Sequence, residues 1–172
     1  MSDKPIAVIM GSDTDWSVTE HTINDLDALG IGYELEVISP HRTPDALHEF
    51  GLSLEERGFK VVIAASGGAA HLAGVLAALT TLPVIGVPVP STSLGGVDAL
   101  YSIVQMPAGV PVATVGIGRS GAKNAVVLAA KILGIADEKY KDLIRNYKEQ
   151  LVEESVQKAE RVAADWQSEV AG

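Results

Sequence analysis

The chain has 172 residues, enough for one domain with a substantial buried core. With 47% hydrophobic and 20% charged residues, its composition is that of a globular protein and excludes a disordered one. A net charge of −9 disfavours binding to nucleic acid or to anionic membranes, and the absence of cysteine excludes disulfides, cysteine nucleophiles and thiolate metal sites.

Short apolar segments and helical patterns alternate along the first 135 residues. The apolar segments predict strands at residues 6–11, 33–38, 60–66, 83–89 and 111–118. The helical patterns that follow them cover residues 16–29, 47–54, 69–79, 97–106 and 121–133. Several strand segments are apolar throughout rather than alternating, which is typical of parallel strands buried on both faces. We therefore expect an α/β fold, a three-layer α/β/α sandwich around a five-stranded parallel sheet.

The carboxyl-terminal region is different, because residues 137–166 contain no strong helix breaker and carry apolar residues at three- and four-residue steps. This pattern predicts a helix of about 30 residues, roughly 45 Å long. We expect one domain over residues 1–172, with a core at about 5–135 and a helical arm at about 137–168. The arm either lies across its own domain or packs on a neighbouring subunit, and its length favours the second alternative.

No membrane association is expected. The apolar run at residues 6–11 is too short for a secretory signal, and no segment is long and apolar enough for a membrane span. A soluble, cytoplasmic protein is the expectation.

Ligands of open parallel sheets bind beyond the carboxyl ends of the strands, and unusual residues follow these strands here. In "ISPHRTPD", Thr43 and Pro44 predict the start of a helix, with Thr43 as its cap. A cation is disfavoured at a helix amino terminus unless an anion binds there, so Arg42 indicates a phosphate site. The neighbouring His41 is suited to proton transfer. A solvated surface loop is the alternative.

Two further strand ends carry candidate residues. In "ASGGAAH", Gly67 allows a ligand close to the backbone, and His71 is either a site residue or a buried structural histidine. In "GSDTDW", Ser12 is suited to a phosphate and Asp15 to sugar hydroxyls, but this stretch taken alone favours ordinary helix capping.

Two other kinds of site are poorly supported. "GIGRSG" has the glycine spacing of a dinucleotide-binding loop, but no later strand follows to supply the acidic residue that binds the ribose. No histidine and carboxylate residues show convincing metal-ligand spacing. We expect neither a cofactor nor a metal.

Taken in order, "MGSDTDW", "SPHRTPD", "GGAAHLAG", "LPVIGVPV" and "GIGRSGAKNA" resemble the class I N5-carboxyaminoimidazole ribonucleotide mutases of purine biosynthesis. The resemblance covers about residues 6–133. It implies a flavodoxin-like core, a homo-octamer, a nucleotide substrate and no cofactor. The implied reaction moves a carboxylate from the exocyclic nitrogen of an aminoimidazole to ring carbon four.

The resemblance also implies roles for individual residues. His41 would transfer the proton and Asp15 would bind the ribose. The implied phosphate-side residues are Ser12, Ser39 and Arg42, and those lining the imidazole and carboxylate pocket are Ser66, Gly67, His71 and Leu72. The sequence departs from the family pattern at Thr14, Pro40, Ala73 and within "AASGG", where Ser66 adds a hydroxyl.

Two other functions remain as alternatives. One is a related carboxylase that adds free carbon dioxide to aminoimidazole ribonucleotide. The other is a non-enzymatic flavodoxin-like binding or receiver module. A phospho-receiver needs an aspartate at the end of the third strand, where this chain has "AASGG".

Overall fold

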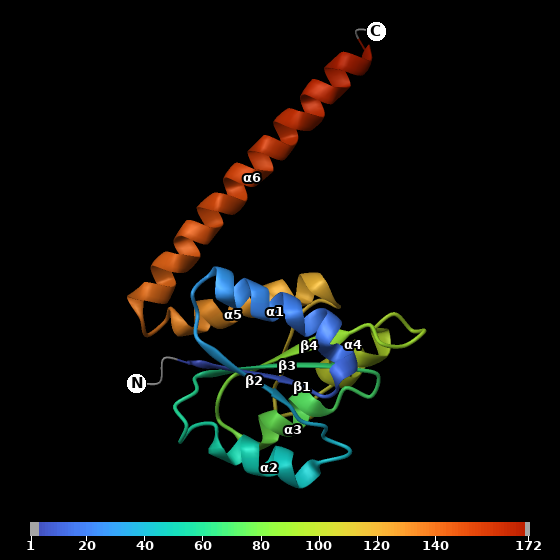
Figure 1. Cartoon of the computed structure of the whole chain (residues 1–172), viewed down its shortest axis with the longest axis vertical. Helices are drawn as coiled ribbons and strands as arrows, with labels where there is room; N and C mark the ends of the chain where they lie inside the picture. Colours follow the sequence, from blue (N-terminus) through green and yellow to red (C-terminus); the bar gives the residue numbers. More distant parts are fainter. Residues whose placement is uncertain (1–3, 171–172) are drawn as a thin grey trace.

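The computed structural model describes residues 4–170 and forms three layers, with helices on both faces of one sheet (Figure 1). The strands are β1 (Ile6–Met10), β2 (Tyr33–Val37), β3 (Val61–Gly67), β4 (Val84–Val89) and β5 (Ala113–Thr114). The helices are the short 3-10 helix η1 (Asp13–Asp15), α1 (Trp16–Ala28), α2 (Pro44–Ser53), α3 (Leu72–Leu79), α4 (Val97–Val104), α5 (Arg119–Leu133) and α6 (Glu138–Val170).

The sheet has the order β2-β1-β3-β4-β5, and every strand pair is parallel. This is the flavodoxin-like order, in which the chain moves outward from β1 to β2 and then crosses to β3 on the other side. Helices α1 and α5 pack together on one face of the sheet, whereas α2, α3 and α4 cover the other (Figure 1). The predicted fold class is therefore confirmed.

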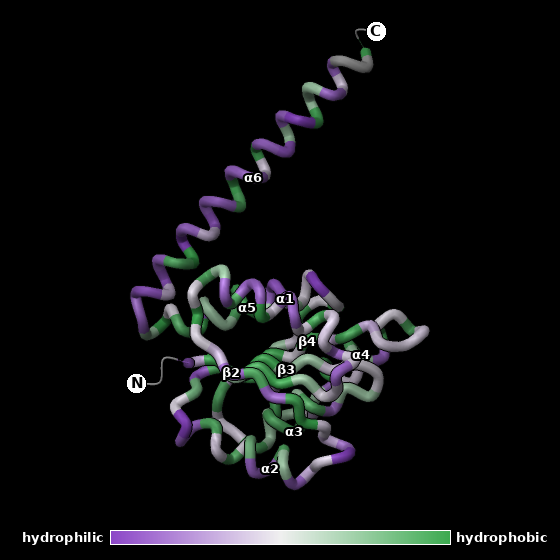
Figure 2. The backbone as a smooth tube through the Cα atoms, viewed as in Figure 1, coloured by the Kyte–Doolittle hydropathy of each residue, from purple (hydrophilic) through white to green (hydrophobic). Residues whose placement is uncertain are grey.

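The central strands explain the continuous apolar segments in the sequence. In β1, Ile6 and Val8 belong to the core under α1 and α5, while Ala7 and Ile9 belong to the core under α2 and α3. Successive side chains of a strand point to opposite faces, so a strand buried on both sides needs an apolar residue at every position. Figure 2 shows this hydrophobic centre along β3 and β4.

The last strand is shorter than residues 111–118. The chain still follows β4, because the Val115 N–H donates to the Gly86 carbonyl at 3.1 Å and the Gly118 N–H donates to the Pro88 carbonyl at 2.9 Å. Pro88 has no N–H to donate in return, so the regular ladder stops after Thr114.

Helix α6 leaves the domain and projects into solvent (Figures 1 and 2). Near its start Ile144 is buried, and Tyr140 and Leu143 pack against the same core. All side chains described from residue 148 onward are exposed, including Trp166 at 66%. The predicted long carboxyl-terminal helix is confirmed, and it does not lie across its own domain. The limits of the expected domain, at residues 1 and 172, lie outside the described residues.

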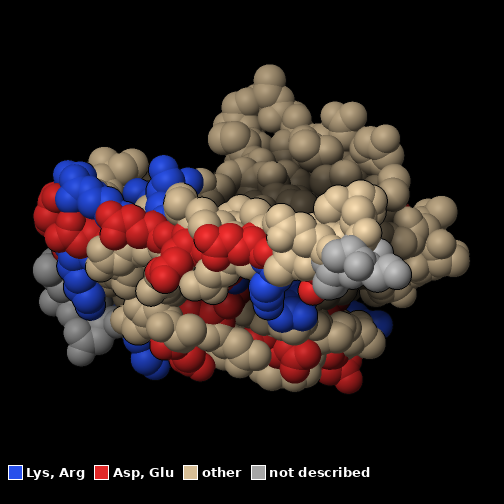
Figure 3. All heavy atoms as spheres, turned by 90° about the horizontal axis from the view of Figure 1, so that it is seen from above, with Lys and Arg blue, Asp and Glu red and all other residues tan. Residues whose placement is uncertain are grey.

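The surface seen from above carries side chains of both charge signs (Figure 3). On α6, Lys141 forms an ion pair with Glu138, and Arg145 forms one with Asp142. Within residues 4–170 no helix combines the length and apolarity that a membrane crossing requires. The same residues contain no cluster of histidine and acidic side chains arranged to hold a metal ion.

Candidate active site

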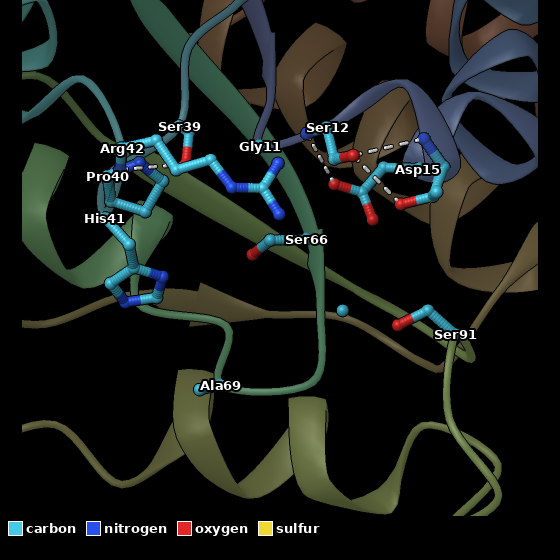
Figure 4. Close-up of a pocket in the computed structure, with 12 residues that line it drawn as sticks. Gly11, Ser12, Asp15, Ser39, Pro40, His41, Arg42, Ser66, Ala69 and Ser91 are labelled. Carbon is cyan, nitrogen blue, oxygen red and sulfur yellow. Dashed lines mark hydrogen bonds between the residues drawn. The ribbon is translucent and has the colours of Figure 1, made fainter.

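A cavity of about 300 Å³ lies beyond the carboxyl ends of β1, β2, β3 and β4. It sits where the strand order reverses between β1 and β3, which is the usual ligand position in this fold. The lining residues are Gly11, Ser12, Thr14, Asp15, Ser39, Pro40, His41, Arg42, Ser66, Gly67, Ala69 and Ser91 (Figure 4). Its size suits a small organic ligand.

After β1, Ser12 and Asp15 form a capping box around η1. The Ser12 N–H donates to Oδ2 of Asp15 at 3.0 Å, and the Thr14 N–H donates to Oγ of Ser12 at 3.3 Å. Asp15 is only 3% exposed. Burial raises the pKa of its carboxyl, and backbone N–H groups, that of Ser12 foremost, oppose this effect. Asp15 therefore takes part in capping η1, and it also presents a desolvated carboxyl to the cavity.

After β2, a tight turn carries His41 and Arg42. The Arg42 N–H donates to Oγ of Ser39 at 3.2 Å, and the Thr43 N–H donates to the Ser39 carbonyl at 3.0 Å. Pro44 begins α2 as predicted, but the predicted side-chain cap by Thr43 is absent. The Thr43 hydroxyl donates to the Ser39 carbonyl instead, at 3.0 Å.

The guanidinium of Arg42 extends over the cavity from the side opposite Asp15 (Figure 4). It has no ion pair with any carboxylate in the described part of the chain. A cation without an internal partner beside a polar cavity is suited to bind an anion.

At the end of β3, Ser66 and Gly67 form the floor of the cavity. Ser66 is 5% exposed, and its hydroxyl has no hydrogen-bond partner among the described residues. A Cβ atom on Gly67 would collide with the side chain of Ser91, which comes from the segment after β4. The cavity therefore contains a buried hydroxyl that lacks a protein partner.

His41 contacts a second histidine. Its Nε2 lies 2.7 Å from Nδ1 of His71, with the two rings nearly perpendicular at 83°. His71 immediately precedes α3 and does not itself line the cavity.

Of the nine residues predicted for the site, seven line this one cavity: Ser12, Asp15, Ser39, His41, Arg42, Ser66 and Gly67. His71 reaches the site through His41, and Leu72 is fully buried in the core. Five further lining residues were not predicted as site residues: Gly11, Thr14, Pro40, Ala69 and Ser91. Ser91 could have been predicted as a site residue, because the polar stretch "PSTSLGG" directly follows a predicted strand.

Two glycines of "GIGRSG", Gly116 and Gly121, allow close packing. A Cβ atom on Gly121 would collide with the backbone carbonyl of Gly116, so glycine lets the start of α5 pack on this loop. Neither residue lines the cavity described above.

Comparisons with known proteins agree with one another. The family described as AIR carboxylase matches residues 5–154. An N5-carboxyaminoimidazole ribonucleotide mutase of Pseudomonas aeruginosa is 55% identical over 143 residues, covering 83% of this chain and 88% of that protein. The mutase of Bacillus subtilis is 56% identical over 144 residues, covering 84% and 87%. A crystal structure of Treponema denticola PurE superimposes with a TM-score of 0.82 at 27% identity, covering 91% of this chain and 96% of the other.

Proposed function

Because the chain belongs to the AIR carboxylase family, we propose that it is an N5-carboxyaminoimidazole ribonucleotide mutase, an intramolecular transferase of purine biosynthesis. The observation that carries this proposal is the single cavity lined by His41, Arg42 and Asp15. These three side chains supply a proton-transfer group, an anion-binding group and an acceptor for sugar hydroxyls. Binding of a nucleotide monophosphate uses the last two, and the carboxylate transfer uses the first.

The substrate phosphate binds on the Arg42 side of the cavity, with the hydroxyls of Ser12 and Ser39 as further polar partners. The ribose hydroxyls donate to the carboxylate of Asp15. The imidazole then lies over Ser66 and Gly67, with its reacting atoms toward His41. This placement gives the otherwise unpartnered Ser66 hydroxyl a hydrogen-bond partner on the ligand.

The proposed reaction has two proton transfers at His41. The protonated histidine gives its proton to the exocyclic nitrogen while the bond from that nitrogen to the carboxyl carbon breaks, which releases carbon dioxide inside the cavity. Ring carbon four attacks the carbon dioxide and forms the new bond. Neutral His41 then removes the proton from carbon four and returns to its starting state. Atoms and charge balance without ATP, an oxidant or a second substrate.

The alternative activity is a carboxylase that uses free carbon dioxide, and the family description contains that word. The mutase is favoured because the relatives that are more than half identical are named mutases. A non-enzymatic flavodoxin-like module is disfavoured by the same relatives.

We further propose a cytoplasmic homo-octamer. The exposed apolar residues of α6 favour association between copies, because side chains such as Val162 and Trp166 are left uncovered by a single chain. A cytoplasmic location fits a phosphorylated substrate, whose charge opposes passage through a membrane.

A comparison of substrates tests the proposal. The enzyme is given the N5-carboxylated nucleotide in one assay, and aminoimidazole ribonucleotide with bicarbonate in another. A mutase turns over the first efficiently and the second poorly, because carbon dioxide held in the cavity has an effective concentration that dilute solution cannot match. Better turnover of the second pair would replace the mutase with the carboxylase.

A further inference from the structure

The contact between His41 and His71 restricts where protons can lie. Two imidazole nitrogens at 2.7 Å share one hydrogen, so one ring donates and the other accepts through a lone pair. The two rings therefore hold at most one positive charge while the contact is intact. Which ring donates decides whether the other nitrogen of neutral His41 carries a hydrogen or a lone pair.

The free nitrogen of His41 is Nδ1, because Nε2 is engaged with His71. Figure 4 agrees with this assignment: one ring nitrogen of His41 faces Ser66 across the cavity, and the other is turned away from it. Proton exchange with a ligand in the cavity therefore takes place at Nδ1.

Helix α3 makes the two histidines unequal. His71 is the residue before the first turn of this eight-residue helix, where unpaired N–H groups create a positive end. A positive charge is disfavoured on His71 for that reason. The other charged residues that line the cavity are Arg42, which follows His41 in the same turn, and Asp15 on the opposite side (Figure 4). The position of His71 at this helix end therefore favours His71 as the acceptor of the contact.

We propose that His71 is a positioning residue that fixes the tautomer of His41. Its Nδ1 accepts the Nε2–H of His41 and holds the lone pair of His41 Nδ1 toward the cavity. This inference rests on the proposed function for its kinetic consequence, whereas the hydrogen-bond direction rests on the contact between the two rings and on the position of His71 at the start of α3. It gives His71 a role other than the direct substrate contact that the family resemblance implies.

The arrangement suits a residue that must act twice. Protonated His41 loses the proton at Nδ1, and the hydrogen bond from Nε2 to His71 stays the same before and after the transfer. The opposite direction, with His71 as donor, would place the hydrogen of neutral His41 on Nδ1. That tautomer has no lone pair facing the cavity and cannot take a proton from ring carbon four.

Neutron diffraction tests the direction without any assay. Crystals of the full chain exchanged into D₂O at alkaline pH are expected to show deuterium on Nε2 of His41 and none on Nδ1 of either ring. Deuterium on Nδ1 of His71 would overturn the proposal. This measurement remains decisive even if the chain proves inactive as a mutase, so its failure is separate from that of the proposed function.

Two substitutions test the consequence for turnover. The amide oxygen of His71→Asn occupies the place of Nδ1 and can accept, whereas His71→Ala removes the acceptor. We expect His71→Ala to lower kcat about 10- to 100-fold with KM unchanged, the loss typical of removing a group that orients a functional histidine. We expect His71→Asn to lower kcat by no more than about threefold, because it restores the acceptor.

The control is His48→Asn, a change of an exposed histidine on α2 that does not line the cavity. Equal losses of kcat in His71→Asn and His71→Ala would overturn the positioning role. A raised KM with unchanged kcat in His71→Ala would show a direct substrate contact instead.

Discussion

The side chain of Ser91 occupies the space in which Gly67 would carry a Cβ atom, so the loop after β4 rests directly on the end of β3. Two segments that are distant in sequence thus meet at the floor of the cavity, and both contribute to its lining. The contact is possible only because position 67 is a glycine.

Gly67→Ala is expected to force Ser91 away and to destabilise the fold by about 1–3 kcal/mol, the usual cost of overpacking. Ser91→Gly should relieve part of this cost, although the Val89 carbonyl, 3.0 Å from the added atom, remains in place. Urea unfolding of both single variants and the double variant measures the coupling, expected at about 0.5–3 kcal/mol. Strictly additive effects would mean that the two residues do not compete for space.

His41→Asn is expected to abolish turnover while leaving the fold intact. Positioned acid–base groups typically contribute about 10²–10⁴-fold, and this residue is proposed to act in both proton transfers. Product formation is measured alongside circular dichroism and nucleotide binding. A folded variant with near-normal turnover would remove His41 from the mechanism.

Arg42→Ala is expected to weaken binding of the phosphorylated ligand by about 1.5–3 kcal/mol, the value of a hydrogen bond to a charged group. Calorimetric titration with the nucleotide and with its dephosphorylated nucleoside measures the difference. Arg42→Lys is the matched control, since it keeps the charge and loses the planar fork. Equal weakening for both ligands in Arg42→Ala would indicate a structural role instead.

Asp15→Asn is expected to stabilise the fold at neutral pH. Burial raises the pKa of Asp15 above 3.8, so the folded state holds the proton more tightly than the unfolded state. The ionised carboxyl therefore costs stability above its folded-state pKa, and the cost disappears as the pH falls below 3.8. The stability gap between variant and wild type in urea unfolding should narrow on acidification. A gap that widens would contradict the raised pKa.

Removal of the exposed part of α6 is expected to break the assembly and spare the domain. A chain ending at Gln150 keeps the buried Ile144 but loses an apolar stripe with alternating four- and three-residue spacing, typical of helix packing. The stripe consists of Val152, Val156, Ala159, Ala163, Trp166 and Val170. Analytical ultracentrifugation compares the truncated and full chains. An unchanged assembly after truncation would exclude the arm as an intersubunit element.

The sequence was most informative where one local pattern has one physical cause. Continuous apolar strands indicated a sheet covered on both faces, and polar residues after each strand indicated the edge that forms the cavity. The residues after β1 and β2 were found because charged groups at a strand end are unusual.

The remaining features depend on contacts between distant segments. The contact of Ser91 with Gly67 and the contact of His41 with His71 have no local sequence signal, because each joins residues from two segments that are distant in the sequence. The length of β5 was overestimated because the decisive residue, Pro88, lies on the neighbouring strand. Thr43 is the N-cap residue of α2 as predicted, but its hydroxyl donates to the Ser39 carbonyl and makes no capping hydrogen bond.

The position of the cavity links ligand binding to global unfolding of the sheet. Its lining comes from segments that follow four different strands, so a bound nucleotide must leave before the sheet can separate. Ligand at a hundred times its dissociation constant would add about 2.7 kcal/mol to the cost of that global opening. Amide hydrogens of β1 and β3 would then exchange with solvent more slowly, whereas those in the exposed half of α6 would exchange at the same rate with or without ligand.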